Sequence, residues 1–175
     1  HEGLFLNGEN IWVANGKNIN TWIIGPDGSL KGEIIPPGTF TEGITDSATT
    51  GKFWVTDWDT KKLYKVRIEE GKMVSEMEIS LAPSLPTGVV RAGEALYVMT
   101  WTRGMGTKYH LIKLDKEGNV LVKMRIKGIS EPSQIAWDGK HLWITSWFNR
   151  RIYKVDPAAF RVLGHFASPA KDTTG

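Results

Sequence analysis

The feature that most constrains the fold is a motif that occurs four times at intervals of more than 40 residues. Its clearest copy, residues 133–147, reads as a short apolar strand, an Asp-Gly turn and a second strand that ends in an aromatic residue. Self-similarity at about 40–50 residues, with several strands in each unit, is the sequence signature of a β-propeller. The aromatic residues that anchor the four copies are spaced 42, 43 and 46 residues apart: Trp12, Trp54, Tyr97 and Trp143.

Each repeat divides into four strands, so the predicted fold is an all-β propeller of four four-stranded blades. The second strand of each repeat is a nearly continuous apolar run, as expected for a strand buried on both faces. The outermost strand alternates apolar and charged residues, which discourages edge-to-edge pairing. In the first repeat the strands are expected at residues 4–6, 11–14, 20–24 and 30–35. The predicted blades are residues 1–40, 41–86, 87–132 and 133–171.

The sequence is compatible with either a closed or an open arrangement of the four blades. Residues 172–175 copy the opening of a repeat, so a fifth unit begins there within the single domain 1–175. One arrangement is a closed four-bladed ring with a short tail, and the other is an arc or half of a larger propeller. An open arc would leave two apolar blade faces in water. We expect an open arc to self-associate into a larger ring.

Composition excludes several classes of protein. The formal net charge is +3 and no run of five like charges occurs, so the chain has no nucleic-acid-binding footprint. No stretch approaches the roughly 20 apolar residues of a membrane span. Cysteine is absent, which rules out disulfides and thiol chemistry. A chain without cysteine is compatible with either a cytoplasmic or an exported location, and the sequence decides neither.

Candidate ligand-binding residues recur at equivalent positions of the repeats. In a propeller, the start of each innermost strand and the end of each second strand meet on one face around the axis. Three tryptophans follow second strands there, and tryptophan suits sugars, planar ligands, cations and peptides. Their alternative role is to plug the axis and pack one blade on the next. The predicted ligand-binding residues are Trp58, Trp101, Trp147, Asn15, and two residues of loops after second strands, Arg103 and Asn149.

Residues with oxygen atoms gather on the same predicted face. Glu2, Glu42, Thr87 and Ser133 directly precede the innermost strands. Oxygen ligands are those that Ca²⁺ and Mg²⁺ prefer, so a divalent metal held by Glu2, Glu42 and Asp57 is one hypothesis. The same carboxyl groups could form an acid/base pair, or could simply be solvated. No cofactor is indicated beyond Ca²⁺ or Mg²⁺.

At this point the sequence resembles known propeller repeats. The segments 43–66 and 134–155 share the pattern of Gly or Gln, then Trp-Val/Ile-Thr, then Leu/Ile-Tyr-Lys-Val. This pattern resembles the NHL-like and streptogramin-lyase-like propellers. The segments 40–44 and 96–101 are also similar to bacterial glutaminyl cyclotransferases, which are propellers. The resemblance implies the fold, and no catalytic residue is transferred, because the paired histidines of the lyases have no counterpart here.

Two functions from different classes follow. The first is a binding module, in which a funnel lined by aromatic and carboxyl groups receives a small ligand, glycan or peptide. The second is a lyase or hydrolase of the streptogramin-lyase-like or lactonase-like propeller type, with or without a divalent metal. The absence of an evident histidine or serine nucleophile at the predicted face favours binding over catalysis.

Overall fold

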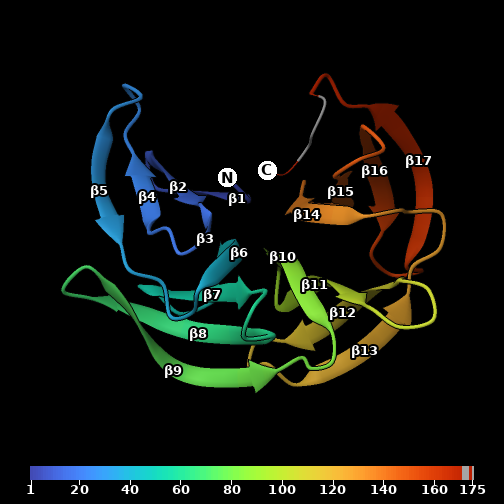
Figure 1. Cartoon of the computed structure of the whole chain (residues 1–175), viewed down its shortest axis with the longest axis horizontal. Helices are drawn as coiled ribbons and strands as arrows, with labels where there is room; N and C mark the ends of the chain where they lie inside the picture. Colours follow the sequence, from blue (N-terminus) through green and yellow to red (C-terminus); the bar gives the residue numbers. More distant parts are fainter. Residues whose placement is uncertain (171–173, 175) are drawn as a thin grey trace.

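The computed structural model describes residues 1–170 and 174, and this part of the chain is built of strands and contains no helix. Four antiparallel sheets stand around a common axis as the blades of a propeller (Figure 1). Within these residues no helix has the length and hydrophobicity needed to span a membrane. The predicted all-β propeller with four four-stranded blades is therefore confirmed.

The strands follow the predicted order, from the axis outward, in every blade. Blade 1 contains β1 (Gly3–Asn7), β2 (Asn10–Ala14), β4 (Thr21–Ile24) and β5 (Leu30–Ile34). Blade 2 contains β6 (Phe40–Asp46), β7 (Lys52–Asp57), β8 (Lys62–Glu69) and β9 (Lys72–Ser80). Blade 3 contains β10 (Leu85–Ala92), β11 (Ala95–Thr102), β12 (Lys108–Asp115) and β13 (Val120–Arg125). Blade 4 contains β14 (Pro132–Trp137), β15 (Leu142–Ser146), β16 (Arg151–Asp156) and β17 (Arg161–Ala167).

One short strand was not expected from the sequence. β3 (Gly16–Lys17) belongs to the loop after β2, yet it pairs with the inner strand of the next blade, with Gly16 opposite Thr41. Gly16 has a φ of 76°, which an L side chain rarely adopts, so glycine permits this turn. The pairing ties blade 1 to blade 2 through the backbone at the axis.

Three hydrophobic clusters hold the blades together, one at each junction between successive blades. Blades 1 and 2 meet around Trp12, Ile44, Phe53 and Val55. Blades 2 and 3 meet around Trp54, Leu63, Val89, Leu96 and Val98. Blades 3 and 4 meet around Tyr97, Leu111, Ile135, Ile144 and Tyr153. Blades 2 and 3 thus use one face for the preceding blade and the other face for the following one.

The burial of the tryptophans differs from the prediction. The sequence predicts Trp12, Trp22, Trp54, Trp137 and Trp143 as core residues, but only Trp12 and Trp54 are fully buried. Trp143 occupies the repeat position of Trp54, and that position faces the following blade. It is only half-buried, because no blade in the described part of the chain follows blade 4.

The inner strands approach so closely that three of them carry glycine at one equivalent position. A Cβ added at Gly3, Gly43 or Gly88 would lie 2.5, 2.8 or 2.7 Å from a backbone atom of the following blade. The fourth repeat has Gln134 there instead. Its Nε2 donates a hydrogen bond of 2.8 Å to the Glu42 carbonyl oxygen, across the axis in blade 2. The Gln134 side chain therefore reaches across the axis, at a repeat position where the other three blades have no side chain.

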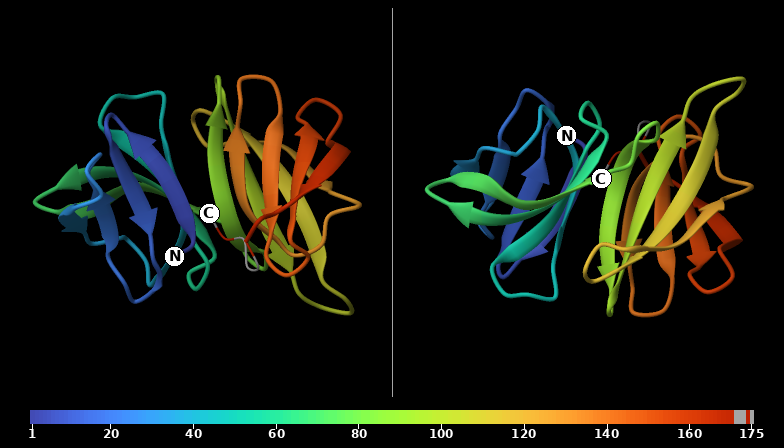
Figure 2. Two further views of the ribbon diagram at one scale, coloured as in Figure 1. Left: turned by 90° about the horizontal axis from the view of Figure 1, so that it is seen from above. Right: turned by 90° about the horizontal axis from the view of Figure 1, so that it is seen from below.

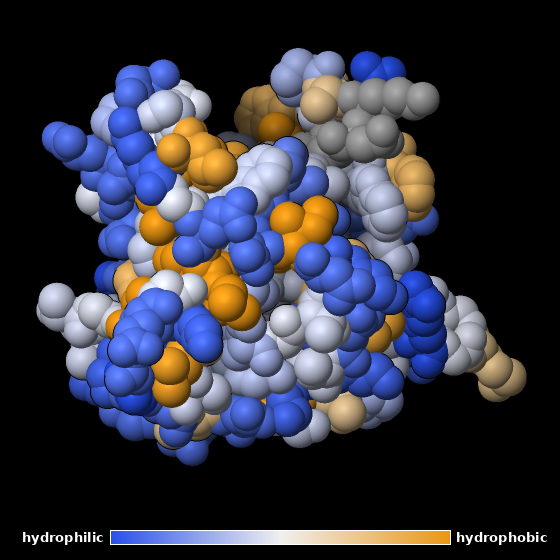
Figure 3. Space-filling view, turned by 60° about the vertical axis from the view of Figure 1, so that its left-hand side comes forward, coloured by the Kyte–Doolittle hydropathy of each residue, from blue (hydrophilic) through white to orange (hydrophobic). Residues whose placement is uncertain are grey.

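The fourth side of the ring is open between the outer parts of blades 1 and 4. Seen from that side, the first and last sheets stand apart (Figure 2, left). In a space-filling view the outline of the molecule is notched between these blades, and apolar side chains reach the surface near the notch (Figure 3). Exposed apolar residues on blade 1 include Leu4, Leu6 and Ile11, and Phe166 is exposed on blade 4.

Candidate functional site

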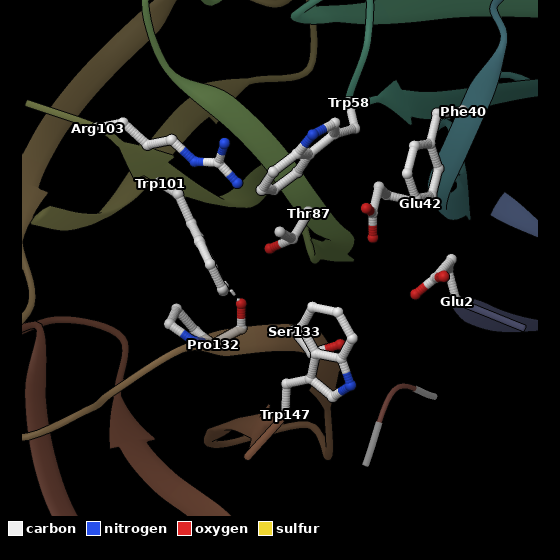
Figure 4. Close-up of a pocket in the computed structure, with 10 residues that line it drawn as sticks. All are labelled: Glu2, Phe40, Glu42, Trp58, Thr87, Trp101, Arg103, Pro132, Ser133 and Trp147. Atoms are coloured by element: carbon white, nitrogen blue, oxygen red, sulfur yellow. Dashed lines mark hydrogen bonds between the residues drawn. The ribbon is translucent and has the colours of Figure 1, made fainter. Parts of the chain in front are cut away.

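A pocket of about 230 Å³ lies at one end of the propeller axis (Figure 4). All four blades contribute to it, through the beginnings of inner strands and the ends of second strands. This is the face on which the repeat pattern predicts a site. The lining residues are Glu2, Phe40, Glu42, Trp58, Thr87, Trp101, Arg103, Pro132, Ser133 and Trp147.

The aromatic wall of the pocket is fixed by contacts among the tryptophans. The rings of Trp58 and Trp101 meet edge to face, with centroids 5.6 Å apart. Trp101 also donates a hydrogen bond of 2.7 Å from its Nε1 to the Pro132 carbonyl oxygen, which orients the ring. The Arg103 guanidinium lies 5.5 Å from the Trp58 ring centroid, as a cation–π contact. The wall is therefore rigid, and Arg103 adds positive charge beside it.

Trp147 forms the exposed side of the pocket. Its side chain is 43% exposed, whereas the corresponding tryptophans of blades 2 and 3 are covered more completely. Its ring stacks on Phe148 with centroids 4.6 Å apart. Trp147 thus presents an aromatic surface at the opening, next to the open side of the ring.

Glu42 is the buried carboxyl group of the site. It lies in β6 and is 6% exposed. Burial, followed by the nearby negative charges of Glu2 and Asp57, raises the pKa of Glu42 to about 8. At neutral pH Glu42 is therefore mainly protonated, and its carboxyl group can donate a hydrogen bond into the pocket.

Asp57 has a structural role that differs from the predicted one. Its Oδ2 accepts a hydrogen bond of 2.6 Å from the Phe40 backbone N–H. Its Oδ1 accepts hydrogen bonds from the backbone N–H and the hydroxyl of Thr60, at 2.9 and 2.8 Å. Asp57 is fully buried and is not among the residues that line the pocket. It ties the start of β6 to the loop that follows β7.

The metal hypothesis requires Glu2, Glu42 and Asp57 to share one ion. Their charges lie near enough for Glu2 and Asp57 to raise the pKa of Glu42, but Asp57 does not line the pocket. Glu2 and Glu42 line the pocket, while both oxygens of Asp57 already accept protein hydrogen bonds. Within residues 1–170 and 174, no group of three His, Cys, Asp or Glu side chains is arranged to hold a metal ion. A Ca²⁺ or Mg²⁺ ion held by these carboxyl groups stays a prediction.

The two predicted asparagines lie outside the pocket. Asn15 is buried, and its Nδ2 donates a hydrogen bond of 2.7 Å to the Asn20 carbonyl oxygen. Asn149 donates from Nδ2 to the Tyr153 hydroxyl at 2.6 Å and lines a separate cavity beside blade 4. The other four predicted ligand-binding residues, Trp58, Trp101, Trp147 and Arg103, all line the pocket.

Four lining residues are outside the predicted ligand-binding and metal sets. Thr87 and Ser133 were expected on this face, whereas Phe40 and Pro132 were not named at all. Phe40 lies two residues before Glu42 on β6, and both line the pocket. The pairing register of β6 shifts between Thr41 and Gly43, so simple strand alternation gave no usable signal for Phe40. Pro132 contributes through the carbonyl oxygen that accepts the Trp101 hydrogen bond, and a backbone contact of this kind leaves no mark in the sequence.

Comparison with known proteins supports the fold. The chain is similar to the glutaminyl cyclase of Myxococcus xanthus, with a TM-score of 0.71 and 12% identity over 95% of this chain and 70% of that one. It is similar to virginiamycin B lyase of Staphylococcus aureus, with a TM-score of 0.59 and 20% identity over 97% of this chain and 56% of that one. It is also similar to hydrazine synthase of Kuenenia stuttgartiensis, with a TM-score of 0.63 and 16% identity over 94% of this chain and 48% of that one.

These similarities define an architecture and no more, because every identity is low. The chain spans about half the length of the hydrazine synthase chain and 60% of a Bacteroides caccae protein of unknown function. No family model matches the sequence. No curated protein matches it either. The predicted resemblance to streptogramin-lyase-like and glutaminyl-cyclase propellers is confirmed at the level of the fold.

Proposed function

We propose that the chain is a binding module whose axial pocket takes the free amino end of a small peptide. The observation that carries this proposal is the separation of charge along an aromatic pocket. In Figure 4 the Arg103 guanidinium lies at one end, and the carboxyl groups of Glu2 and Glu42 lie at the other. A ligand with an amine at one end and a carbonyl or carboxylate group at the other matches this arrangement.

The aromatic residues between these ends favour a ligand with an apolar body. Trp58, Trp101 and Phe40 offer ring surfaces, and Trp147 covers part of the opening. A cation over such rings gains about 0.5–2 kcal/mol, depending on how far it is desolvated. The volume of about 230 Å³ suits an amino acid or a dipeptide rather than a folded partner. A glycan could use the rings and form hydroxyl hydrogen bonds with the charged groups, but it would supply no opposite charge for them.

The test is a titration with the dipeptide Ala-Phe and with its N-acetylated form, followed by calorimetry. We expect the free dipeptide to bind at least about ten-fold more tightly, which corresponds to about 1.4 kcal/mol. Glu2→Gln should reduce this preference, and Trp101→Ala should weaken binding of both forms. Trp137→Phe, a half-buried tryptophan outside the pocket, is the matched control. Equal binding of the free and acetylated dipeptides would refute the amine-recognition proposal.

A catalytic role at the same pocket is the second candidate, and Glu42 favours it. A carboxyl group with a pKa of about 8 can give and take a proton near neutral pH. The reaction to test is the one named by the Myxococcus xanthus protein, cyclisation of an amino-terminal glutamine. In that step the neutral α-amine forms a bond to the side-chain amide carbon and the bond to the amide nitrogen breaks. Glu42 gives its proton to the departing nitrogen, which leaves as ammonia, and takes back the proton that the attacking amine loses.

Ammonia release from the dipeptide Gln-Phe measures this activity directly. Glu42→Gln keeps the size and hydrogen-bonding capacity of the side chain but cannot transfer the proton. We expect it to abolish turnover while dipeptide binding is retained. Absence of ammonia release from the unmodified chain, with binding intact, would leave the binding module as the function.

A further inference from the structure

Blades 1 and 4 each leave one face without a neighbouring blade. We name the outward face of blade 1 the leading face, defined by Leu4, Ile11 and Val13, and that of blade 4 the trailing face, defined by Trp143, Ile152 and Phe166. Leu4 is 58% exposed and Ile11 is 40% exposed. Phe166 is 59% exposed. Apolar side chains gathered on one sheet face in this way mark a binding surface.

The leading face carries the residues that the other blades bury against a preceding blade. By strand register, Leu4 opposite Val13 corresponds to Ile44 opposite Val55 in blade 2. Ile44 is 5% exposed and Val55 is fully buried, because blade 1 covers them. Leu4 is 58% exposed because no blade of the described chain covers it, whereas Val13 is only 8% exposed, beside Trp22 of its own blade. The leading face is therefore a blade interface of the same kind with its partner absent.

The trailing face carries the residues that the other blades bury against a following blade. Trp143 corresponds to Trp54, which is 1% exposed in the junction between blades 2 and 3. Ile152, opposite Thr145, corresponds to Leu63, opposite Thr56, which is fully buried in the same junction. Both faces thus repeat the two halves of an interface that occurs three times within the chain.

The space between the two faces is narrow at the axis. The Gln134 side-chain oxygen Oε1 lies 3.2 Å from the position that a Cβ on Gly3 would take. Thr174 lies in this space, where its carbonyl oxygen accepts a hydrogen bond of 3.2 Å from the Ser133 hydroxyl. Thr174 also borders a cavity of about 360 Å³ against Leu4, Val13 and Trp22. In the repeat pattern Thr174 matches Thr87, which lies near the start of the inner strand of blade 3.

We propose that the leading and trailing faces together bind one four-stranded antiparallel blade of the same repeat type, with its inner strand along the line of Thr174. A second copy of the chain does not fit between the leading and trailing faces. It would have to insert four blades into a gap that is only one strand wide at the axis. Each blade of a second copy also has at most one free face, whereas the occupant needs two. The bound blade would complete the wall of the pocket between Glu2 and Trp147.

The completion of the pocket wall rests on the proposed function, but the packing of the bound blade against the two faces does not. The test extends the 175-residue chain after Gly175 with a copy of residues 44–86, so that Thr174-Gly175 replaces the Glu-Gly pair at 42–43. Blade 2 is suitable because both of its faces are buried in the chain. Hydrogen exchange is then followed in β1 and β15, the strands of the end blades. We expect exchange there to slow by about ten-fold or more, because the end blades gain an interface.

Leu4→Asp is the variant that separates docking from a general gain in stability. It should have little effect in the 175-residue chain, where Leu4 is exposed, and should remove most of the protection in the extended chain. Leu121→Asp, at a leucine that is 55% exposed on β13, is the matched control and should change neither chain.

A second extension with residues 89–132 in place of 44–86 guards against an appended blade that fails to fold by itself. Unchanged exchange in β1 and β15 with both extensions would overturn the proposal. A discrete dimer of the 175-residue chain in sedimentation, dissociated by Leu4→Asp, would also overturn it, because a second copy would then cover the leading face.

Discussion

At the scale of single residues, Glu42 is the group whose chemistry depends most on its surroundings. Its ordinary pKa of 4.5 is raised to about 8, so the folded protein holds a proton that the unfolded chain releases above about pH 4.5. The folded state binds more protons between these two values. Its free energy of unfolding is therefore highest relative to that of a Glu42→Gln variant at acid pH, and falls as the pH rises toward 8.

This pH dependence is the first prediction at this scale. Denaturant unfolding of the unmodified chain and of Glu42→Gln, at intervals from pH 5 to pH 8.5, should show a difference that grows with pH in favour of the variant. We expect the change across this window to amount to a few kcal/mol. Parallel profiles for the two proteins would show that Glu42 is not held protonated in the folded state.

A second residue-scale prediction concerns the crowded axis. A Cβ at Gly88 would lie 2.7 Å from the Ile135 backbone nitrogen and 2.9 Å from the Gln134 Cα. Backbone cannot move aside as a flexible side chain can, so Gly88→Ala should destabilise the fold by roughly 1–3 kcal/mol, the usual cost of overpacking. Gly104→Ala is the control, since nothing lies within 4 Å of its Cβ position. Thermal unfolding of both variants measures the difference, and equal midpoints would contradict the tight approach of the inner strands.

At the scale of strands and blades, the position of a residue in the repeat predicts which blade it faces. Its burial also depends on whether that neighbouring blade exists. Trp54 and Trp143 share one repeat position, yet Trp54 is 1% exposed and Trp143 is half-buried. The Trp143 Nε1 donates a hydrogen bond of 2.7 Å to Asp138 Oδ2, on the rim of its own blade.

These two tryptophans give a prediction about blade packing. Trp54→Ala should cost about 3–5 kcal/mol, because it leaves a cavity between blades 2 and 3. Trp143→Ala should cost about 1–2 kcal/mol, since it removes one hydrogen bond and partial burial. Urea unfolding of both variants gives the comparison. Similar losses would mean that Trp143 is covered in solution, which would imply a partner on the trailing face.

The sequence predicted the blades well because the signal is repeated four times. Turns with glycine, apolar second strands and charged outer strands recur in each copy, so a weak pattern in one repeat is supported by the others. The clustering of Trp58, Trp101 and Trp147 with Glu42 followed from the same periodicity. What the pattern could not give was the direction of each side chain. Asp57 occupies a position that suits the pocket, but it turns toward the N–H groups of Phe40 and Thr60.

At the scale of the whole molecule, the four blades form a linear series bent around an axis. Blades 2 and 3 have a neighbour on both faces, and blades 1 and 4 have one neighbour each in the described chain. In such arrays stability is approximately the sum of the individual units and the interfaces between neighbours. The two inner blades should therefore be the last to open.

Native-state hydrogen exchange tests this expectation. Amides of β7 and β11 should exchange most slowly, while those of β2 and β15 should exchange faster, because the end blades can open by losing a single interface. Uniform protection across all four second strands would instead indicate one cooperative unit in which the pairing of β3 with β6 and the Gln134 hydrogen bond hold the end blades as firmly as the inner ones.

The common direction of the blades has a consequence for how such a molecule can evolve. Blades 2, 3 and 4 each place a residue near the start of the inner strand and a tryptophan at the end of the second strand at the same end of the axis, as Glu42 and Trp58 do in blade 2. Duplication of one repeat would therefore bring two new side chains to the pocket in a single genetic event. Drift at only these two positions could then change the ligand, while the interfaces between blades keep the residues on which the fold depends.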